Sequence, residues 1–422
     1  MNKKKTIFII SIIIGISALI TLGILAVKYY NNIINSDNKN TNENNQEIEK
    51  MDTYIYDKNG NELDIIKYGD VSYFDNVKSY YMASALENIL NDIIEKENVT
   101  EAEAEIILVT NGYKIYLCED YNEQEKLEQI YENDENFLDD LDAATIVLDN
   151  STGEVSAIIG GRNKYSNIIT FGEDKKALGN IAIKNMATAA LFQPTHMLPI
   201  ISVYACGLEK GIITLDSIYS DDSLEVNLNW KPQNYYNYSQ GDITIKKAIE
   251  TGSNLVKIRV LQDIGIETSY EFIKSIGITG LREEYDKNLP ALALGGTTQG
   301  VKPIEISSAY RTILTDGIYK TPIFYNKVID SSGEVYLKNE QNENYVVKEE
   351  VCKKLKSCLN TTIHEKDVYI KEAKHQQNLE HWCNITTDKY TYTTICYHSK
   401  SSFKEINSKE NTAKELLTKI IN

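Results

Sequence analysis

One apolar run near the start of the chain divides the sequence into two unequal parts. Thr6 to Val27 is almost uninterrupted in its apolar character, and a helix needs roughly 20 such residues to cross a bilayer core. Lysines at positions 3–5 precede the run. The positive-inside bias therefore predicts a cytoplasmic tip and transmembrane anchor over residues 1–30, with the rest of the chain outside the cell. A cleaved signal peptide is the alternative, but the run is longer than a usual signal core and no small-residue cleavage motif follows it.

Composition and length predict a tether and two folded parts after this run. Residues 31–52 are rich in Asn and Glu and poor in apolar side chains, as in a solvated linker. The chain of 422 residues is too long for one compact core. We expect a small α+β pedestal over residues 53–140 and a larger domain over residues 141–422.

Charge and cysteine patterns exclude several classes of function. The formal net charge of −17 argues against nucleic acid as a partner, because phosphate backbones are bound by clustered Lys and Arg. The six cysteines form no C-x-x-C pair and no ligand spacing with His, so the sequence supports neither a metal nor another cofactor. Cys383 and Cys396 lie on two β-like runs separated by a polar turn. They are the pair to test first for a disulfide, which an extracytoplasmic location permits.

Local patterns predict strands and helices on both sides of residue 140. Alternating and β-branched residues from Ala143 to Asn163 predict a hairpin that turns at Asn150 to Gly153. Apolar spacing predicts a helix over Ser84–Glu97, and Thr100 begins a capping pattern for the next helix. Further expected elements are a turn at Asn59-Gly60, a strand over 112–117 and a helix over 123–131.

The segment 185–200, NMATAALFQPTHMLPI, followed by LEKG at 208–211, resembles the serine-helix segment of the penicillin-binding protein transpeptidases. Three more stretches resemble the same family: AATIVLDNSTGEVSAIIGG at 143–161, WKPQNY at 230–235 with GDITIKKAI at 241–249, and PALALGGTTQGVKP at 290–303. The resemblance implies an α+β sandwich of the penicillin-binding transpeptidase and β-lactamase type. In that fold the hairpin at 143–161 shares a sheet with the strands around Trp382 and Thr391–Tyr397, and the helix after Pro199 packs against that sheet.

The pedestal also resembles part of this family. The run YIYDKNGNEL at 54–63 is similar to the start of the extracellular part of class A members. Too few residues separate it from Ala143 for a complete glycosyltransferase domain, so we expect the intervening residues to form only a connecting piece.

The positions that carry the family's chemistry are degenerate in this chain. Transpeptidases use the motifs S-x-x-K, S-x-N and K-T-G, which meet in one cleft. The resemblance places Thr195 at the serine of the first motif and Leu198 at its lysine. Gly252 and Asn254 fall at the serine and asparagine of the second motif. For the third motif, Lys371 or Lys374 falls at the lysine, and the glycine is absent.

These replacements bear directly on catalysis. Leu198 has no atom that accepts a proton, and the methyl group of Thr195 stiffens χ1 and crowds the path of attack. His196 could act as a substitute base, but neighbouring residues on a helix do not face each other. Asn254 either binds a peptide amide or ties together the backbone of a loop, and we expect Ser253 to face solvent.

Two functions from different classes follow. The first is a membrane-anchored, non-catalytic pseudo-transpeptidase of peptidoglycan assembly, whose partners are stem peptides or wall-synthesis proteins. The second is a divergent peptidoglycan D,D-transpeptidase that uses Thr195. Because function belongs to the site and not to the fold, the geometry around Thr195, Asn254 and Lys374 decides between them.

Overall fold

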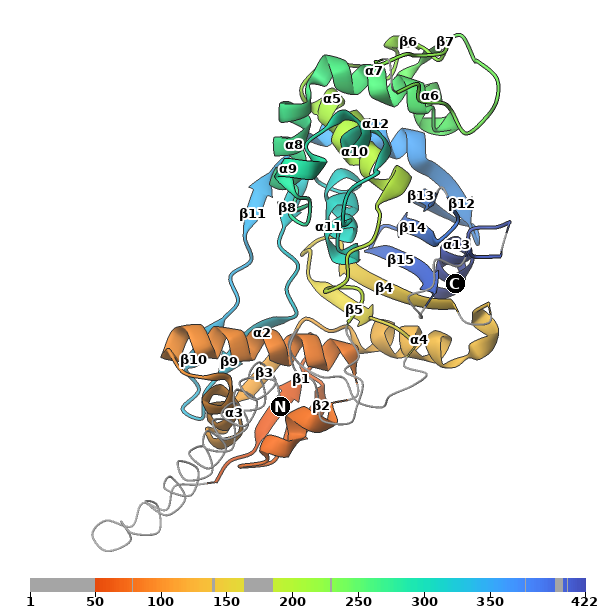
Figure 1. Cartoon of the computed structure of the whole chain (residues 1–422). Coiled ribbons are helices and arrows are strands. Elements are labelled where there is room, and N and C mark those ends of the chain that lie inside the picture. Colours follow the sequence, from red (N-terminus) through yellow and green to blue (C-terminus); the bar gives the residue numbers. More distant parts are fainter. Residues whose placement is uncertain are drawn as a thin grey trace, which may run out of the picture.

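The computed structural model of the chain describes residues 50–422, with gaps at 78, 139–140, 163–184, 228–229, 376, 399–404 and 408. The predicted anchor at 1–30 and nearly all of the predicted tether at 31–52 lie outside the described residues. Among the described residues, no helix combines the length and the apolar character needed to cross a membrane. Figure 1 shows a pedestal at the bottom, a central sheet above it and a group of helices at the top.

A six-stranded antiparallel sheet forms the centre of the molecule, in the order β12-β13-β14-β15-β4-β5. The predicted hairpin at 143–161 is confirmed, since β4 and β5 pair across the turn after Asp149. This hairpin also shares its sheet with the strands around Trp382 and Thr391–Tyr397, as the family resemblance implies. The strands are β4 (Leu141–Asp149), β5 (Val155–Ile159), β12 (Asn360–Ile363), β13 (Lys366–Lys374), β14 (Glu380–Thr386) and β15 (Tyr390–His398).

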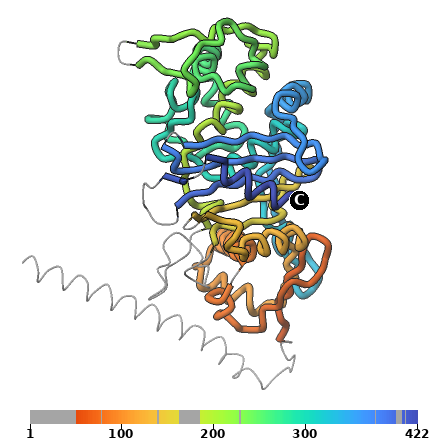
Figure 2. Tube along the Cα trace, turned by 90° about the vertical axis from the view of Figure 1, so that its right-hand side faces the viewer, coloured from red at the N-terminus to blue at the C-terminus, as the bar shows by residue number. Residues whose placement is uncertain are grey.

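Helices from distant parts of the sequence cover the two faces of this sheet. Because side chains alternate along a strand, His381 and Trp382 point to opposite faces. His381 Nδ1 lies 2.9 Å from Thr412 Oγ1 in α13 (Thr412–Ile420), whereas Trp382 Nε1 donates to the Gln193 carbonyl oxygen at 2.9 Å. On the Trp382 face, α11 (Pro303–Ile313) packs against β15 and β4. Figure 2 shows the strands stacked between the pedestal and the helical layer.

The helix after Pro199 is packed differently from our expectation. It begins as the 3-10 turn η3 (Thr195–Met197), continues as the π-helical η4 (Ile200–Ala205) and ends in α5 (Cys206–Glu209). Every residue of η4 is buried, and its main neighbours are helices α7, α8, α10 and α11 and not the strands. A helix that is apolar all round is surrounded by other elements, and α11 takes the place against the sheet.

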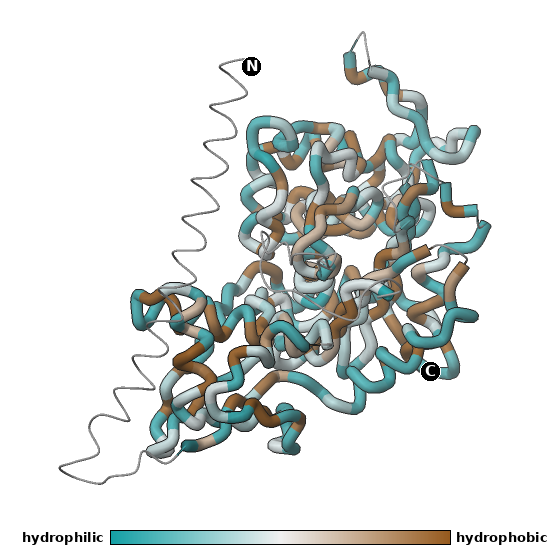
Figure 3. The backbone as a smooth tube through the Cα atoms, turned by 60° about the horizontal axis from the view of Figure 1, so that its bottom comes forward, coloured by the Kyte–Doolittle hydropathy of each residue, from teal (hydrophilic) through white to brown (hydrophobic). Residues whose placement is uncertain are grey.

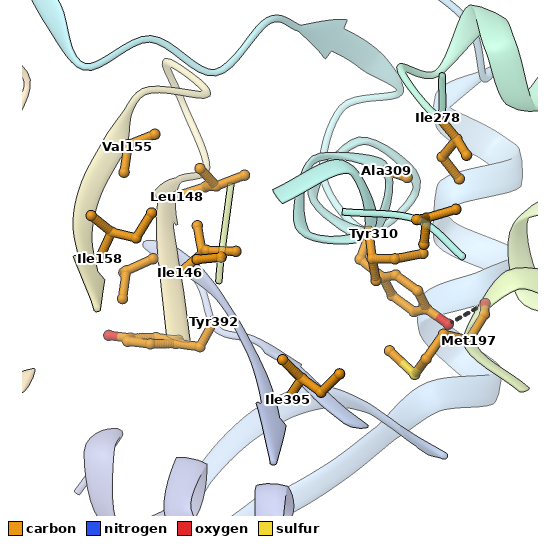
Figure 4. Packing of buried hydrophobic residues seen from close by; sticks show 14 of the residues in the cluster. Ile146, Leu148, Val155, Ile158, Met197, Ile278, Ala309, Tyr310, Tyr392 and Ile395 are labelled. Carbon is orange, nitrogen blue, oxygen red and sulfur yellow. Dashed lines mark hydrogen bonds between the residues drawn. The ribbon is translucent and has the colours of Figure 1, made fainter. Parts of the chain in front are cut away.

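The rest of the helical layer surrounds η4. Tyr310 of α11 donates its hydroxyl hydrogen to the Met197 carbonyl oxygen at 2.9 Å, and Figure 4 shows this ring beside Met197. In the same view Ile146, Leu148 and Ile158 project from the hairpin β4–β5. The remaining elements of this part are β6 (Ile218–Ser220), β7 (Asp242–Thr244), α6 (Ile245–Thr251), α7 (Asn254–Ile264), α8 (Ile266–Ser275), α9 (Glu283–Asp286), α10 (Leu289–Leu294), β8 (Ile318–Lys320), β11 (Glu343–Tyr345) and α12 (Glu349–Leu359).

The pedestal is built from two separate stretches of sequence. Its five-stranded sheet has the order β10-β9-β3-β1-β2, with β1 (Thr53–Tyr56), β2 (Glu62–Ile66), β3 (Lys114–Leu117), β9 (Tyr325–Ile329) and β10 (Val335–Lys338). The predicted turn, strand and helices are present, and the capping box between Thr100 and Glu103 is formed. The pedestal helices are η1 (Val71–Asn76), α2 (Tyr80–Glu97) and α3 (Glu101–Thr110). Figure 3 shows how hydrophobic and hydrophilic stretches alternate along the backbone.

The predicted domain boundary at residue 140 does not match the packing. The hairpin β9–β10 follows α11 in the chain but completes the pedestal sheet. Helix α4 (Tyr121–Glu132), which we placed in the pedestal, packs against β5 and is followed by the short turn η2 (Asp134–Asn136). Gln124 of α4 both donates to the Ile158 carbonyl and accepts from the Ile158 amide, so a side chain supplies the partners that an edge strand lacks.

The cysteine pair that we singled out is not a disulfide. Cys383 and Cys396 are free, and both lie on the α13 face of adjacent strands. Cys383 is paired in register with Thr394 and Cys396 with His381, so the two cysteines are diagonal neighbours. Diagonal positions are about 7–8 Å apart, which is beyond the usual reach of a disulfide.

Candidate functional site

Thr195 occupies the expected place at the start of the buried helix, in an unusual conformation. Its φ angle is +46°, a region that β-branched residues rarely adopt. The residue is buried, and among the described residues its hydroxyl oxygen has no hydrogen-bond partner. A hydroxyl group activated for attack is bonded to a base, and the Thr195 hydroxyl has no such contact among the described residues.

The ALGGTT stretch at 293–298 holds this strained turn. A Cβ atom at Gly295 would lie 1.9 Å from the Thr195 carbonyl oxygen, so only glycine allows this approach. Two residues further on, the Thr297 amide donates to Gln193 Oε1 at 2.9 Å, and Gln193 Nε2 donates back to the Thr297 carbonyl at 2.5 Å. The Q-P and A-L-G-G stretches therefore contact each other through the Gln193 side chain and through the close approach of Gly295 to the Thr195 backbone.

Leu198 is part of the hydrophobic core. Its side chain has no exposed surface, and the Ser202 hydroxyl donates to its carbonyl oxygen at 3.0 Å. The position at which the family pattern carries a lysine thus holds an apolar group that cannot bind a proton.

The second motif forms the junction between α6 and α7. Gly252 ends α6 with φ +72°, in the left-handed conformation that favours glycine. Ser253 is fully buried, which corrects our expectation of a solvent-facing side chain. It is the N-cap of α7, and its hydroxyl donates to Asp221 Oδ1 at 2.5 Å while accepting from the Val256 amide. Asn254 Nδ2 donates to the Gln233 carbonyl at 3.0 Å, so the asparagine does tie together loop backbone.

An amine that the sequence reading missed lies beside Asn254. Lys257, one helical turn further along α7, is 3% exposed. Its Nζ lies 3.0 Å from His196 Nδ1, and it donates to the Gly252 carbonyl at 3.0 Å and to Asn254 Oδ1 at 3.2 Å. The lone lysine in the apolar run LVKIRVL, three residues after Asn254, is the sequence signal that could have identified it.

The third motif lies on β13, which runs along η3. Lys371 is directly opposite Asn384 and Ala373 opposite Trp382, so Lys371 is on the same face as the turn that carries Thr195. Lys374 is on the other face, where its Nζ donates to the Lys409 carbonyl at 2.5 Å. The structure therefore brings Lys371, and not Lys374, to the other candidate residues, because strand alternation separates the two lysines.

Burial and neighbouring positive charge lower the proton affinity of three basic groups in this region. The neighbouring Lys257 ammonium, together with burial and Lys371, lowers the pKa of His196 to about 3. Burial lowers the pKa of Lys257 well below its ordinary value, and Lys371 adds to this effect. Burial likewise lowers the pKa of Lys371. Like charges that share a low-dielectric site cannot all be ionised, so the cluster holds fewer protons than three free side chains would.

One carboxyl group borders the Thr195 turn. Glu380 Oε2 at the start of β14 accepts a hydrogen bond from the Gln193 amide at 3.1 Å, and burial raises the pKa of Glu380 to about 7. No ion pair joins Glu380 to the basic cluster among the described residues. Among those residues there is also no group of His, Cys, Asp and Glu side chains that could hold a metal ion.

Among the described residues, the contact that would activate the Thr195 hydroxyl is not found. Acyl transfer to a hydroxyl requires a base within hydrogen-bond reach of that hydroxyl. Here the candidate base, His196, is directed at Lys257, and Thr195 Oγ1 has no partner in the described part of the chain. The region also holds the half-buried Lys371 amine, for which no hydrogen bond or ion pair is found among the described residues.

Comparison with known proteins gives a consistent result. The sequence pattern of the family described as penicillin binding protein transpeptidase domain matches residues 143–381, which is more than half of the chain. Penicillin-binding protein 1A of Clostridium novyi (strain NT) is 25% identical over 281 residues, covering 64% of this chain and 32% of that protein. Penicillin-binding protein 1F of Bacillus subtilis (strain 168) is 29% identical over 193 residues, covering 46% of this chain and 24% of that protein. The chain thus spans about a third or less of these relatives' length.

Solved structures share the fold. Penicillin-binding protein A from M. tuberculosis, determined as an imipenem acyl-enzyme complex, superposes with a TM-score of 0.66 at 12% identity, covering 88% of this chain and 98% of that one. PonA1 from Mycobacterium tuberculosis in complex with penicillin V gives a TM-score of 0.64 at 17% identity, covering 80% of this chain and 92% of that one. At such low identity the likeness concerns the fold alone.

Proposed function

We propose that this chain, which belongs to the penicillin-binding protein transpeptidase family, is a non-catalytic member that serves peptidoglycan assembly by binding. Two observations carry the proposal. Thr195 Oγ1 has no hydrogen-bond partner among the described residues. The nearby amine of Lys257 is hydrogen-bonded to His196, Gly252 and Asn254. A hydroxyl group becomes an effective nucleophile when an adjacent base takes its proton, and neither observation supplies such a pair.

Covalent labelling tests this proposal directly. We expect purified protein incubated with a fluorescent penicillin to show no labelled band and no mass increase, while an active family member treated in parallel is labelled. Thr195→Ala is expected to behave as the wild type. A penicilloyl adduct on Thr195 that disappears in Thr195→Ala would instead establish the divergent D,D-transpeptidase, the second function that we considered.

The ligand that suits this region best is a stem peptide with a free carboxylate. Lys371 lies on the η3 face of β13 without an ion pair in the described part of the chain, and strand edges can hold an extended peptide along the backbone. We expect a stem-peptide mimic to bind as the carboxylate and about tenfold or more weakly as its C-terminal amide, as is typical when a buried charge loses its partner. Lys371→Met should remove this difference. Lys374→Met, on the opposite face, is the matched control and should retain it.

We also place the protein in the cell membrane with its folded part outside. The apolar run Thr6–Val27 and the lysines before it support this topology. Protease added to intact, wall-stripped cells should then degrade the C-terminal part, and protection of that part would contradict the proposed orientation.

A further inference from the structure

A cavity between the pedestal and α4 contains acidic groups that the proposed function does not use. Its volume is about 460 Å³, and it is lined by β2, η1, the start of α2, the loop after β3 and one face of α4. Among the described residues that line it are four acids, Asp64, Glu119, Glu125 and Glu128, and no Lys, Arg or His. Apolar and aromatic side chains, including Leu63 and Met82, form the rest of its wall.

Glu119 is the distinctive member of this group. It is 6% exposed, and its carboxyl group makes no hydrogen bond or ion pair with the described residues. The next residue, Asp120, has contacts of 2.6 Å from Lys58 Nζ and 2.5 Å from the Tyr390 hydroxyl. In spite of burial, these contacts lower the pKa of Asp120 to about 2, whereas burial raises the pKa of Glu119 to about 8. Of these two successive buried acids, Asp120 has a cationic partner, whereas Glu119 has none among the described residues.

The other acids of the cavity have neutral partners only. The Tyr73 hydroxyl donates to Asp64 at 2.6 Å and the Tyr121 hydroxyl to Glu125 at 3.2 Å. Gln124 Nε2 donates to Glu128 at 2.7 Å. These bonds orient the carboxylates but neutralise none of them. A concave site lined by charges of one sign focuses the potential and attracts the opposite charge.

We propose that this cavity binds an aliphatic cation, a guanidinium or primary ammonium group on a short alkyl stem, with the charge at Glu119 and the stem against the apolar wall. A buried unpaired carboxyl group gains most from a charged donor. The rings of Tyr73 and Tyr121 add faces on which a cation is stabilised. The apolar side chains of the wall suit an alkyl stem but would not bind a metal ion. Among the described residues, no group of side chains that could hold a metal ion is found.

Binding of such a cation should be coupled to release of a proton. Acidic groups face Glu119 from α4 (Glu125 and Glu128) and from β2 (Asp64), and Asp57 and Asp120 add further negative charge. Together with burial they keep Glu119 protonated at neutral pH. A cation that requires the ionised form should then bind about twentyfold more tightly at pH 8.5 than at pH 6.5, because the ionised fraction rises by that factor around a pKa of about 8.

Calorimetric titration of the full chain tests the proposal. The probes are N-acetyl-arginine methylamide and N-acetyl-lysine methylamide, which represent a basic side chain of a protein, and 1,5-diaminopentane, which represents a free amine. N-acetyl-citrulline methylamide is the neutral control. We expect at least one cation to bind with the stated pH dependence and citrulline not to bind. Preference for the blocked amino acids would identify a protein-borne side chain, and preference for the diamine a free amine.

A pair of matched variants completes the test. Glu119→Gln should weaken binding by at least about tenfold and abolish its pH dependence. Glu135→Gln removes an exposed acid outside the cavity and should change neither. The proposal is overturned if no cation binds at pH 8.5, if citrulline binds equally well, if Glu119→Gln binds as the wild type, or if only calcium binds. The pH profile of the wild type tests it even if a variant folds poorly.

Discussion

The pair of His196 and Lys257 makes the stability of the folded protein depend on pH in a way that can be calculated. In the folded chain, the neighbouring Lys257 charge and burial lower the pKa of His196 to about 3, and the two nitrogen atoms lie 3.0 Å apart. In the unfolded chain, histidine titrates near pH 6.5. Below that pH the unfolded pair holds two protons and the folded pair holds one, whichever nitrogen carries it.

The sign and magnitude of the pH effect on the free energy of unfolding follow from this difference in bound protons. Because the unfolded state binds more protons below pH 6.5, the free energy of unfolding falls as the pH is lowered through that value. Between pH 7.5 and 5.5 the histidine should contribute a loss of about 1.4 kcal/mol. The loss continues toward the folded pKa of about 3, and the lowered pKa of Lys257 acts in the same direction.

His196→Gln is the informative perturbation, since glutamine keeps an acceptor for Lys257 but does not titrate. The free energy of unfolding in urea, measured at both pH values, should fall by about 1.4 kcal/mol less in the variant than in the wild type. Proton NMR of the imidazole ring, assigned by the resonance missing in His196→Gln, gives its pKa directly. A ring that titrates near pH 6.5, or an unchanged pH dependence in the variant, would refute the reasoning and restore His196 as a candidate base.

Three further expectations can be checked with standard measurements. Gly295→Ala should lower the free energy of unfolding by about 2–4 kcal/mol, because its Cβ would lie 1.9 Å from the Thr195 carbonyl oxygen and φ is +76°. Gly296→Ala, which has no atom within 4 Å of the added Cβ, should change it by less than about 0.5 kcal/mol, and equal losses would contradict this account of the turn. Thr195→Ser combined with Leu198→Lys should lower the melting temperature without producing penicillin labelling, because Leu198 is wholly buried and a lysine there adds a fourth base to the cleft region.

Much of the fold could be predicted from the sequence because its signals are local. The hairpin β4–β5, the capping box at Thr100 and the turn at Asn59-Gly60 each depend on residues close together in the chain. The errors concern packing between distant segments. The hairpin β9–β10 joins the pedestal across more than two hundred residues of sequence, and α4 leaves it to cover β5, neither of which has a local signature. The anchor and tether remain predictions.

The candidate site residues remain predictions, but their arrangement can be compared with the sequence. The family resemblance singled out Thr195, Leu198, Gly252 and Asn254, and the structure gathers the turn, the α6–α7 junction and β13 in one region. The resemblance could not show that Lys257 reaches His196, because α7 and η3 are far apart in sequence. Nor could it choose between Lys371 and Lys374, since that choice depends on which face of β13 packs on η3. Register and side-chain direction are tertiary properties.

The position of Lys257 gives the losses at the catalytic positions a common physical explanation. Asn254 Oδ1 and the Gly252 carbonyl are part-buried acceptors at the α6–α7 junction, and such groups are stabilised by a donor. With Leu198 in the core, that donor comes from α7 itself, and the same amine is bonded to His196, the residue after Thr195. An amine that bonds to these three acceptors holds the region together and has no contact with the Thr195 hydroxyl among the described residues. Under the proposed non-catalytic function, the residues that replace the motifs contribute to the stability of this region and not to catalysis.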